Sequence, residues 1–302
     1  MDRIATIPLQ RIMTDGIQRS QSRLGETQQD LATGRRVHSY ADLGSNAVRS
    51  ISAHSMLSRH KAEMQVSKHV ETTLGLYDTH LTNMDNQLTE MRTQMLTALG
   101  NEDGTGLQEA FEGAFERFRD SLNADEGGVY LFGGSSSEVK PFMPKDFQAA
   151  QWNPTVNAFR SDGNQAKATI GENHTMTFGI GAREAGEQIY DAFRTLSQAA
   201  PFKDGEMTWG NKTAIRTALE QLDDGLGKLR NVNGENGRKM AKLDAITEAA
   251  EKRSLVFERI ISESEDADLG KVATDLAKHQ ASLQASYSVF ARLSSLSLTN
   301  YL

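Results

Sequence analysis

From Val70 onward, apolar residues recur at alternating steps of four and three, and this spacing constrains the fold more than any other feature of the chain. The positions are Val70, Leu74, Tyr77, Leu81, Met84, Leu88, Met91 and Met95. Such a repeat is typical of a coiled-coil seam, in which a helix buries one side against a partner helix. No proline interrupts Ser45 to Leu99, and the glycine-containing stretch GNEDGTG follows. We therefore predict one helix over these residues, roughly 80 Å long.

A second seam indicates where the partner helix lies. Ile215, Leu219, Leu222, Leu226 and Leu229 follow the same steps. We expect this helix to continue past NVNGENG through the apolar positions Met240, Leu243, Ile246, Phe257 and Ile260. Packing of the two long helices within one chain explains both seams.

Two shorter helices are predicted beside the long pair. The first has its apolar face at Leu107, Phe111, Phe115, Phe118 and Leu122. The second begins near Arg183, and its apolar positions are Ile189, Tyr190, Phe193 and Leu196.

Between Gly127 and about Gly181 the helical period disappears and strand signals replace it. GGVYLFGG is a short apolar run bounded by glycines. QAKATIGENHTMTFGIG alternates apolar and other residues on both sides of a Gly-Glu-Asn turn, which predicts a hairpin. Its apolar positions are Ala168, Ile170, Met176, Phe178 and Ile180.

These patterns predict a mainly α fold, an elongated rod of long antiparallel coiled-coil helices with a small β-containing insertion domain at one end. We divide the chain into five segments. They are an amino-terminal assembly segment (1–45), the first half of the rod (46–127), a small β-rich insertion domain (128–182), the second half of the rod (183–265) and a carboxyl-terminal assembly helix (266–302).

Composition narrows the classes of function. The chain has no cysteine, so it has neither a disulfide framework nor a thiolate nucleophile or ligand. A net charge of -7 without a basic cluster argues against nucleic acid as a partner. No apolar run approaches the roughly 18 residues of a membrane span, and the amino terminus lacks the pattern of a conventional secretory signal. We expect no nucleic acid and no membrane among the partners.

The carboxyl end is unusual for a water-soluble protein, because no charged side chain follows Arg292. An apolar stripe runs into this tail, and a weaker one with polar residues between its members lies at the amino end. We take both stripes as the candidate assembly interface. Its residues are Ile17, Leu24, Leu31, Leu283, Tyr287, Phe290, Leu293, Leu296 and Leu298.

An energy comparison suggests that these ends need partners. Burial of about ten large apolar side chains from Leu276 onward would contribute on the order of 15 to 30 kcal/mol. Ordering the segment costs a similar amount, at roughly 1 to 2 kcal/mol per residue. We predict that both ends are labile in the free monomer and become helical on assembly with copies of the same protein. The alternative is that both ends pack along the rod of their own chain.

Several short motifs resemble the bacterial flagellin and hook-associated family. DLATGRRV resembles the signature that closes the family's first helix, and it supplies Leu31, Thr33, Gly34, Arg35, Arg36 and Val37. Gly34 suits a left-handed helix cap, and the two arginines sit favourably beside the carbonyl end of that helix. SYADLGSNAVRSIS resembles the family's turn into the long helix. EDADLGKVATDL, which contains Asp266, Ala267 and Asp268, resembles its entry to the carboxyl-terminal helix.

Two passages resemble the family's junction proteins, which join hook to filament, more than its filament subunits. They are VYLFGGSSSEVKPF and RLSSLSLTNYL. The resemblance implies a structural component of the flagellum, exported unfolded through the type III channel and located outside the cell. Its implied partners are copies of itself, other axial proteins such as a hook-associated protein and flagellin, and an export chaperone on the carboxyl-terminal helix. A filament-forming flagellin with a small insertion is the alternative.

Motifs for catalysis, cofactors and metals are incomplete. GEMTWGNKT has Asn211 and Glu206 where a phosphate loop needs glycines, and Ser137 replaces the second glycine of a nucleophile elbow. The histidines show no metal-binding pair, and we expect them to be solvated or to face partners. Glu263, Glu265, Asp266 and Asp268 are predicted to favour the start of the last helix electrostatically. We predict no enzymatic activity, no cofactor and no metal. Less favoured alternatives are a coiled-coil adaptor and an enzyme housed in the insertion.

Overall fold

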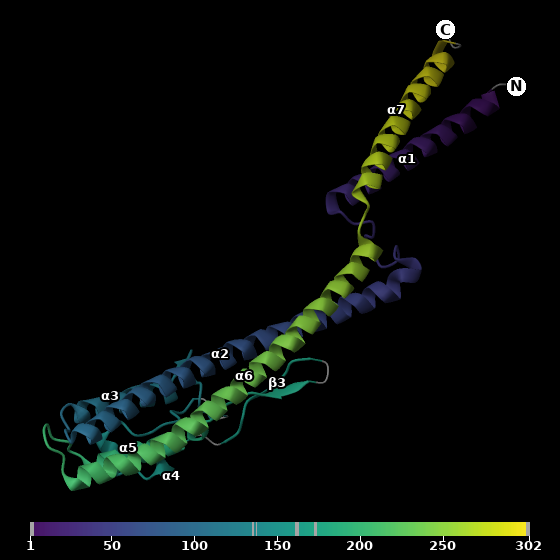
Figure 1. The fold of residues 1–302 in the computed structure, drawn as a ribbon. Coiled ribbons are helices and arrows are strands. Elements are labelled where there is room, and N and C mark those ends of the chain that lie inside the picture. Colours follow the sequence, from purple (N-terminus) through teal and green to yellow (C-terminus); the bar gives the residue numbers. More distant parts are fainter. Residues whose placement is uncertain (1–2, 135, 137, 161–162, 172–173, 300–302) are drawn as a thin grey trace. The chain divides into compact units, whose positions relative to one another are not determined.

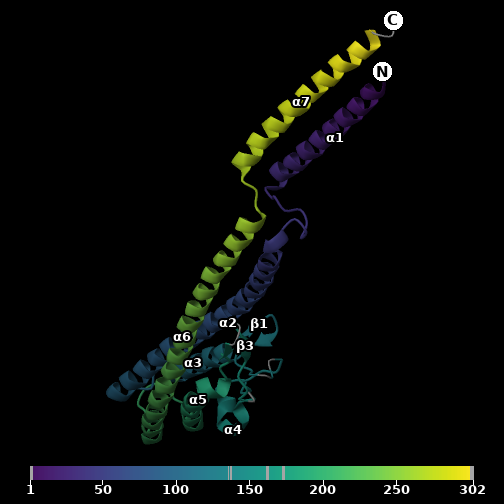
Figure 2. The ribbon, with the colours of Figure 1, turned by 90° about the vertical axis from the view of Figure 1, so that its right-hand side faces the viewer.

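The computed structural model describes the backbone of residues 3–134, 136, 138–160, 163–171 and 174–299, and the side chains of this set within 11–292. The chain forms two compact units. Unit 1 comprises Met1–Arg59 and Arg253–Leu302, and unit 2 comprises His60–Lys252. Figures 1 and 2 show that long helices dominate each unit. The predicted mainly α fold with long antiparallel helices and a small β-containing insertion is confirmed.

The predicted long pair is formed by helices α2 (Ala47–Asn101) and α6 (Trp209–Glu265). Helix α6 runs through NVNGENG without interruption. In unit 2 the seam is closed, because each predicted α2 position from Val70 to Met95 is 3% exposed or less. The five predicted α6 positions from Ile215 to Leu229 are buried as well.

Polar side chains fix how α2 and α6 pair in unit 2. Arg92 donates to Asp223 through Nε and Nη2, and Arg230 donates to Asp85 through Nε at 2.7 Å and Nη2 at 3.3 Å. Asp85 precedes Arg92 on α2, whereas Arg230 follows Asp223 on α6, so the helices are antiparallel. Buried Asn236 adds a bond from Nδ2 to the backbone oxygen of Leu74 at 2.8 Å. Such polar contacts select one register from those that an apolar repeat permits.

Helices α3 (Leu107–Leu122) and α5 (Ala182–Ala199) bring aromatic residues to the core of unit 2. All predicted apolar positions of both helices are buried. The ring of Phe193 lies 5.3 Å from that of Phe115 and 5.4 Å from that of Phe118, measured between centroids. These separations are in the range that aromatic pairs favour.

Two small antiparallel sheets lie between α3 and α5 in the sequence. Strand β1 (Asp125–Glu126) pairs with β2 (Val129–Tyr130), and β3 (Lys167–Thr169) pairs with β4 (Thr175–Thr177). The predicted hairpin is confirmed, with Ala168 opposite Met176. The strand in GGVYLFGG is shorter than its apolar run and covers only Val129–Tyr130. Gly127 and Gly128 form the turn between β1 and β2, with φ angles of 63° and 88°.

The rest of this segment packs on α3 and α5. It contains the 3-10 helix η2 (Gln148–Gln151) and the short helix α4 (Thr155–Ala158). Phe142 lies 5.5 Å from Phe118 of α3 and 5.3 Å from Tyr190 of α5, measured between ring centroids. Tyr190 donates its hydroxyl to the backbone oxygen of Asn153 at 2.9 Å. The division of the chain into five segments stays a prediction.

Unit 1 holds α1 (Arg3–Thr33), the 3-10 helix η1 (Gly44–Asn46), the first turns of α2, the last turns of α6, and α7 (Leu269–Thr299). Figures 1 and 2 both place α1 and α7 side by side, running in opposite directions. Among the side chains that the structure describes in this unit, few apolar ones are buried. They are Leu43, Ala53, Ile261 and Val272.

Candidate assembly interface

Helices α1 and α7 pack through a seam in which apolar and polar positions alternate. The covered positions of α1 include Met13, Ile17, Ser20, Leu24 and Thr27. Those of α7 include Val272, Leu276, His279, Leu283, Ser286 and Phe290. The steps of three and four are those of a coiled coil, but serine, threonine and histidine occupy positions that are apolar in a strong one. The seam therefore buries less apolar surface than the α2–α6 seam of unit 2.

One side-chain bond sets the register of the α1–α7 pair. Gln21 donates from Nε2 to the hydroxyl oxygen of Tyr287 at 2.6 Å. In an antiparallel pair with this register, Ile17 lies level with Phe290 and Leu24 with Leu283. Ser20 and Ser286 fall between these two apolar layers.

The structure divides the nine predicted assembly residues into three groups. Ile17, Leu24, Leu283 and Phe290 are half-buried at seam positions within the chain. Leu31 and Tyr287 are 41% and 46% exposed. Leu293, Leu296 and Leu298 belong to α7, but their side chains lie outside the described residues. Their part in assembly stays a prediction.

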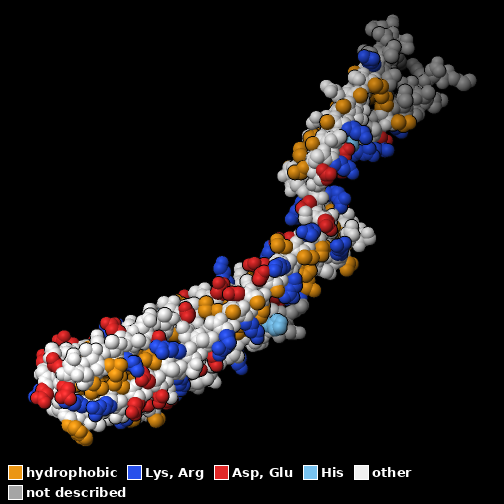
Figure 3. All heavy atoms as spheres, in the orientation of Figure 1, with side chains coloured by type: hydrophobic (Ala, Val, Ile, Leu, Met, Phe, Trp, Pro, Cys, Tyr) orange, Lys and Arg blue, Asp and Glu red, His pale blue; other side chains and the backbone are white. Residues whose placement is uncertain are grey.

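Further apolar side chains face away from the seam and were not among the predicted assembly residues. Ile12 is 68% exposed, Leu269 is 52% exposed and Val289 is 46% exposed. Figure 3 shows hydrophobic side chains along the visible face of α1 and α7. The sequence does contain a signal for them, because each is an apolar residue that falls between the seam positions of its own helix. The pair thus leaves these apolar side chains exposed to solvent at several points along its length.

The motif at the end of α1 forms a turn that contacts the end of α6. Gly34 has a φ angle of 68°, and its N–H donates to the oxygen of Asp30 at 2.9 Å, which confirms the predicted left-handed cap. The placement of the two arginines at the carbonyl end of α1 is wrong. Arg36 donates from Nη2 to the oxygen of Ser264 at 3.2 Å, and Arg35 lies 3.9 Å from the carboxylate of Glu265. Both guanidinium groups therefore lie at the last turn of α6.

Most of the remaining residues of the two family motifs, at the end of α1 and at the start of α7, make hydrogen bonds. Thr33 donates its hydroxyl to the oxygen of Gln29 at 2.8 Å, and Val37 is half-buried. Asp268 accepts from the N–H groups of Gly270 and Lys271 at 3.0 and 3.1 Å, so it caps α7 as its predicted electrostatic role requires. Asp266 accepts from the hydroxyl of Ser262 at 2.5 Å, and the N–H of Ala267 donates to the oxygen of Gly34 at 2.9 Å.

Glu265 differs from the other acidic residues because it is buried, at 6% exposure. Its Oε1 accepts from the hydroxyl of Ser50 at 2.5 Å and from Nε2 of His54 at 2.7 Å. Burial acts to raise the pKa of Glu265, but the bonds from Ser50 and His54 and the positive charges of His54 and Arg35 outweigh it, so the pKa is lowered. The expectation that Glu265 favours the start of α7 is wrong, because its carboxylate binds α2 instead. The side chain of His54 stays 42% exposed, as expected for a partly solvated histidine. Ser50 and His54 are one helical turn apart, which is the signal that sequence reasoning missed.

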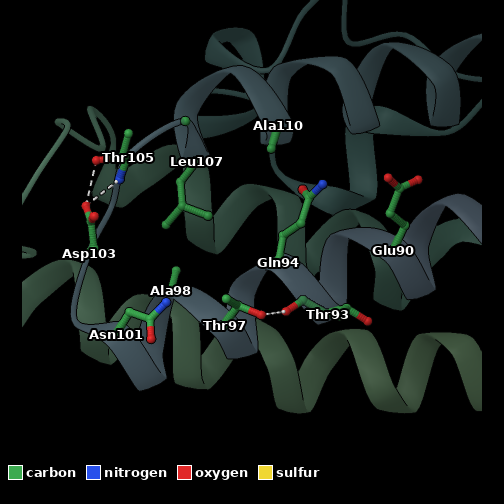
Figure 4. A pocket seen from close by; sticks show the side chains of 11 residues that line it. Glu90, Thr93, Gln94, Thr97, Ala98, Asn101, Asp103, Thr105, Leu107 and Ala110 are labelled. Carbon is green, nitrogen blue, oxygen red and sulfur yellow. Dashed lines mark hydrogen bonds between the residues drawn. The ribbon is translucent and has the colours of Figure 1, made fainter.

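A hollow of about 510 Å³ lies in unit 2 between the end of α2 and the start of α3. Figure 4 shows its threonine, glutamine and asparagine side chains and the bonds from Thr105 to Asp103. Its lining contains no histidine, serine or lysine to act with its carboxylates Glu90 and Asp103. Across the residues that the structure describes, no group of three His, Asp or Glu could hold a metal ion, and no helix is long and apolar enough to cross a membrane.

Comparisons with known proteins point to one family. Residues 4–137 match the model of the bacterial flagellin N-terminal helical region. The chain is 20% identical to flagellar hook-associated protein 3 of Salmonella typhimurium over 98% of both chains. It is 22% identical to flagellar hook-associated protein 3 of Escherichia coli over 94% of both chains.

Solved structures share the fold. A structure described as a flagellar hook-associated protein from Vibrio parahaemolyticus matches 74% of this chain and 100% of its own, with a TM-score of 0.60 and 18% identity. FlgL of Bacillus cereus matches 70% of this chain and 98% of its own, with a TM-score of 0.56 and 16% identity. The amino-terminal family match and the full-length relatives confirm the resemblance to the bacterial flagellin and hook-associated family, most like hook-associated protein 3, and the solved structures show the same fold.

Proposed function

We propose that this chain is a structural component of the bacterial flagellum that joins hook to filament, and that it assembles through its terminal helices. The observation that carries the proposal is the α1–α7 pair, whose seam is partly polar and whose outer surface includes Ile12, Leu269 and Val289. An isolated pair leaves this apolar surface in water, whereas neighbouring copies in a ring can cover it. The same surface supports the prediction that the ends are labile in the free monomer.

The junction role is favoured over a filament subunit by the extent of the likeness. The relatives named hook-associated protein 3 match over nearly their whole length, and the segment between α3 and α5 lies within the matched part of this chain. A filament-forming flagellin with a small insertion is the second candidate. Purified protein that stays monomeric until hook ends are added supports the junction role, and long filaments from the protein alone support the second candidate.

The proposed partners follow from this place in the flagellum. They are copies of the same chain, a hook-associated protein and flagellin as axial neighbours, and an export chaperone that covers α7 before assembly. The proposed route is the type III channel, and the final location is the flagellum outside the cell. A chain without cysteine carries no disulfide that would hinder passage in an unfolded state. We propose no enzymatic activity.

Replacing Phe290 by Asp tests the role of the terminal helices. The substitution places a charge in an apolar layer of the seam, so we expect α7 to lose its contacts and the protein to be absent from flagella. The matched control is Gln284→Asp on the exposed side of the same helix, which should assemble normally. Circular dichroism should show that unit 2 stays folded in both variants. Normal, motile flagella with the Phe290→Asp chain would refute the proposal.

A further inference from the structure

We infer that Glu265 is a positioning residue whose carboxylate holds the two connectors of unit 1 together as one joint. The first connector, residues 34–46, leads from α1 to α2, and the second, residues 266–268, leads from α6 to α7. The joint fixes how the assembly helices α1 and α7 leave α2 and α6. Its role in assembly rests on the proposed function, whereas its role in holding the connectors does not.

Apolar packing contributes little to this joint. Within 34–46 the single buried residue is Leu43, and none of residues 266–268 is buried. The connectors meet in one isolated antiparallel bridge between Arg35 and Asp266. Two backbone bonds frame it, from Arg36 to the oxygen of Glu265 at 2.8 Å and from Ala267 to the oxygen of Gly34 at 2.9 Å. A bridge of this length is not stable alone in water, so other contacts must hold it.

One further bond, from Nη2 of Arg36 to the oxygen of Ser264 at 3.2 Å, joins the first connector to α6. The side chain of Glu265 supplies the remaining contacts. It accepts bonds from Ser50 and His54 of α2, and its second oxygen lies 3.9 Å from Nη1 of Arg35 in the first connector. Its own backbone ends α6 and begins the second connector. One ionised side chain thus touches α2, the first connector and the end of α6. Bonds to an ionised group are stronger than those between neutral groups, and burial excludes the water that would compete with them.

Glu265 differs in exposure from the acidic residues beside it, as expected for a side chain that is held in place by specific contacts. The side chain of Glu265 is 8% exposed, whereas the neighbouring acids Glu263 and Asp266 are exposed. Burial of a carboxylate is costly unless donors and positive charge meet it. Ser50, His54 and Arg35 meet these needs from two parts of the chain, so loss of the charge should free both connectors at once.

Limited trypsin cleavage of the full-length chain tests the joint, because Arg35 and Arg36 lie in the first connector. We expect Glu265→Gln to be cut after these arginines about tenfold faster than the wild type, since it removes a charge-assisted contact. Ser50→Ala should act in the same direction with a smaller effect. The matched control is Glu263→Gln, an exposed acid two residues away, which should be cut at the wild-type rate. If unit 2 unfolds in each variant as it does in the wild type, the change is local.

The outcomes distinguish a joint that needs the charge of Glu265 from one that needs only the size of its side chain. Glutamine keeps the size of Glu265 and one acceptor oxygen but lacks the charge, so wild-type cleavage of Glu265→Gln would overturn the inference. Incorporation into flagella then tests the role in assembly. If the wild type joins hooks and Glu265→Gln does so equally well, the joint has no part in assembly. If the wild type itself never joins hooks, the proposed function fails, and the cleavage result still decides whether the joint exists.

Discussion

Gly225 and Gly227 lie two residues apart in α6 and have different surroundings. A Cβ on Gly225 would lie 2.7 Å from Cγ1 of Ile189 and 3.0 Å from its backbone nitrogen, so α5 and α6 approach too closely for any side chain there. A Cβ on Gly227 would meet no atom within 4 Å. The first glycine is required by packing, whereas the second only weakens a helix interior.

We predict opposite effects of alanine at these two positions. Gly225→Ala should lower the free energy of unfolding by about 1 to 3 kcal/mol, because backbone atoms of α5 must move. Gly227→Ala should raise it by about 0.5 to 1 kcal/mol, because alanine favours the helix. Urea unfolding followed by circular dichroism compares the two directly. Destabilisation by both would show that the surroundings of Gly227 are not open.

Glu265 should make the stability of unit 1 depend on pH. Its folded pKa lies below the ordinary value of 4.5, so its contribution to stability is complete above about pH 5 and is lost as the pH falls through the lower, folded value. We expect the hydrogen-exchange protection of the first turns of α2, relative to the intrinsic rate at each pH, to decrease as the pH falls below about 5, more steeply in the wild type than in Glu265→Gln. Because other carboxyls titrate in the same range, the difference between the two proteins is the measurement. Parallel pH profiles would contradict the lowered pKa.

At the scale of elements, the polar layers of the α1–α7 seam limit how firmly the pair holds. Ser286 lies between the apolar positions Leu283 and Phe290 on the covered side of α7, and Ser288 is exposed. Ser286→Leu should therefore stabilise the helix pair by about 1 kcal/mol, since a half-buried leucine gains part of its full burial energy. Ser288→Leu, the matched control, should not. Amide hydrogen exchange in α1 and α7 of the free monomer measures the effect, and equal exchange in both variants would refute the assigned seam.

Periodicity predicted the elements more fully than it predicted the contacts between connectors. The seams from Val70 and from Ile215 gave α2 and α6, because a repeat of four and three residues leaves few other ways to bury apolar surface. The bonds between Ser50 and Glu265 could not be found this way, since these residues are far apart in sequence and no local pattern joins them. For the same reason, the arginines after Gly34 were assigned to the helix that precedes them rather than to α6.

At the scale of the whole molecule, the two units differ in how they are stabilised. Unit 2 has a continuous core in which residues such as Leu88, Phe115 and Tyr190 are 1% exposed or less. The buried apolar side chains described in unit 1 are few, and polar bonds such as those of Glu265 hold its connectors. The labile ends predicted from the sequence therefore belong to the unit with the smaller core.

We predict two thermal transitions for the free chain, with unit 1 unfolding below unit 2, because less apolar surface is buried in unit 1. Differential scanning calorimetry of the full-length protein should resolve them. Leu88→Ala should lower only the upper transition, at a cost of about 2 to 5 kcal/mol. A single transition that shifts as a whole in this variant would show that the units unfold together.

The two ion pairs of unit 2 also restrict the alignment in which α2 and α6 can pair. A repeat of seven would accept α6 displaced by one heptad along α2 in either direction, because apolar side chains would still meet. Displacement one way would set Asp85 against Asp223, and displacement the other way would set Arg92 against Arg230. Each mistake places like charges face to face, so the four side chains penalise both neighbouring alignments as well as favouring the native one.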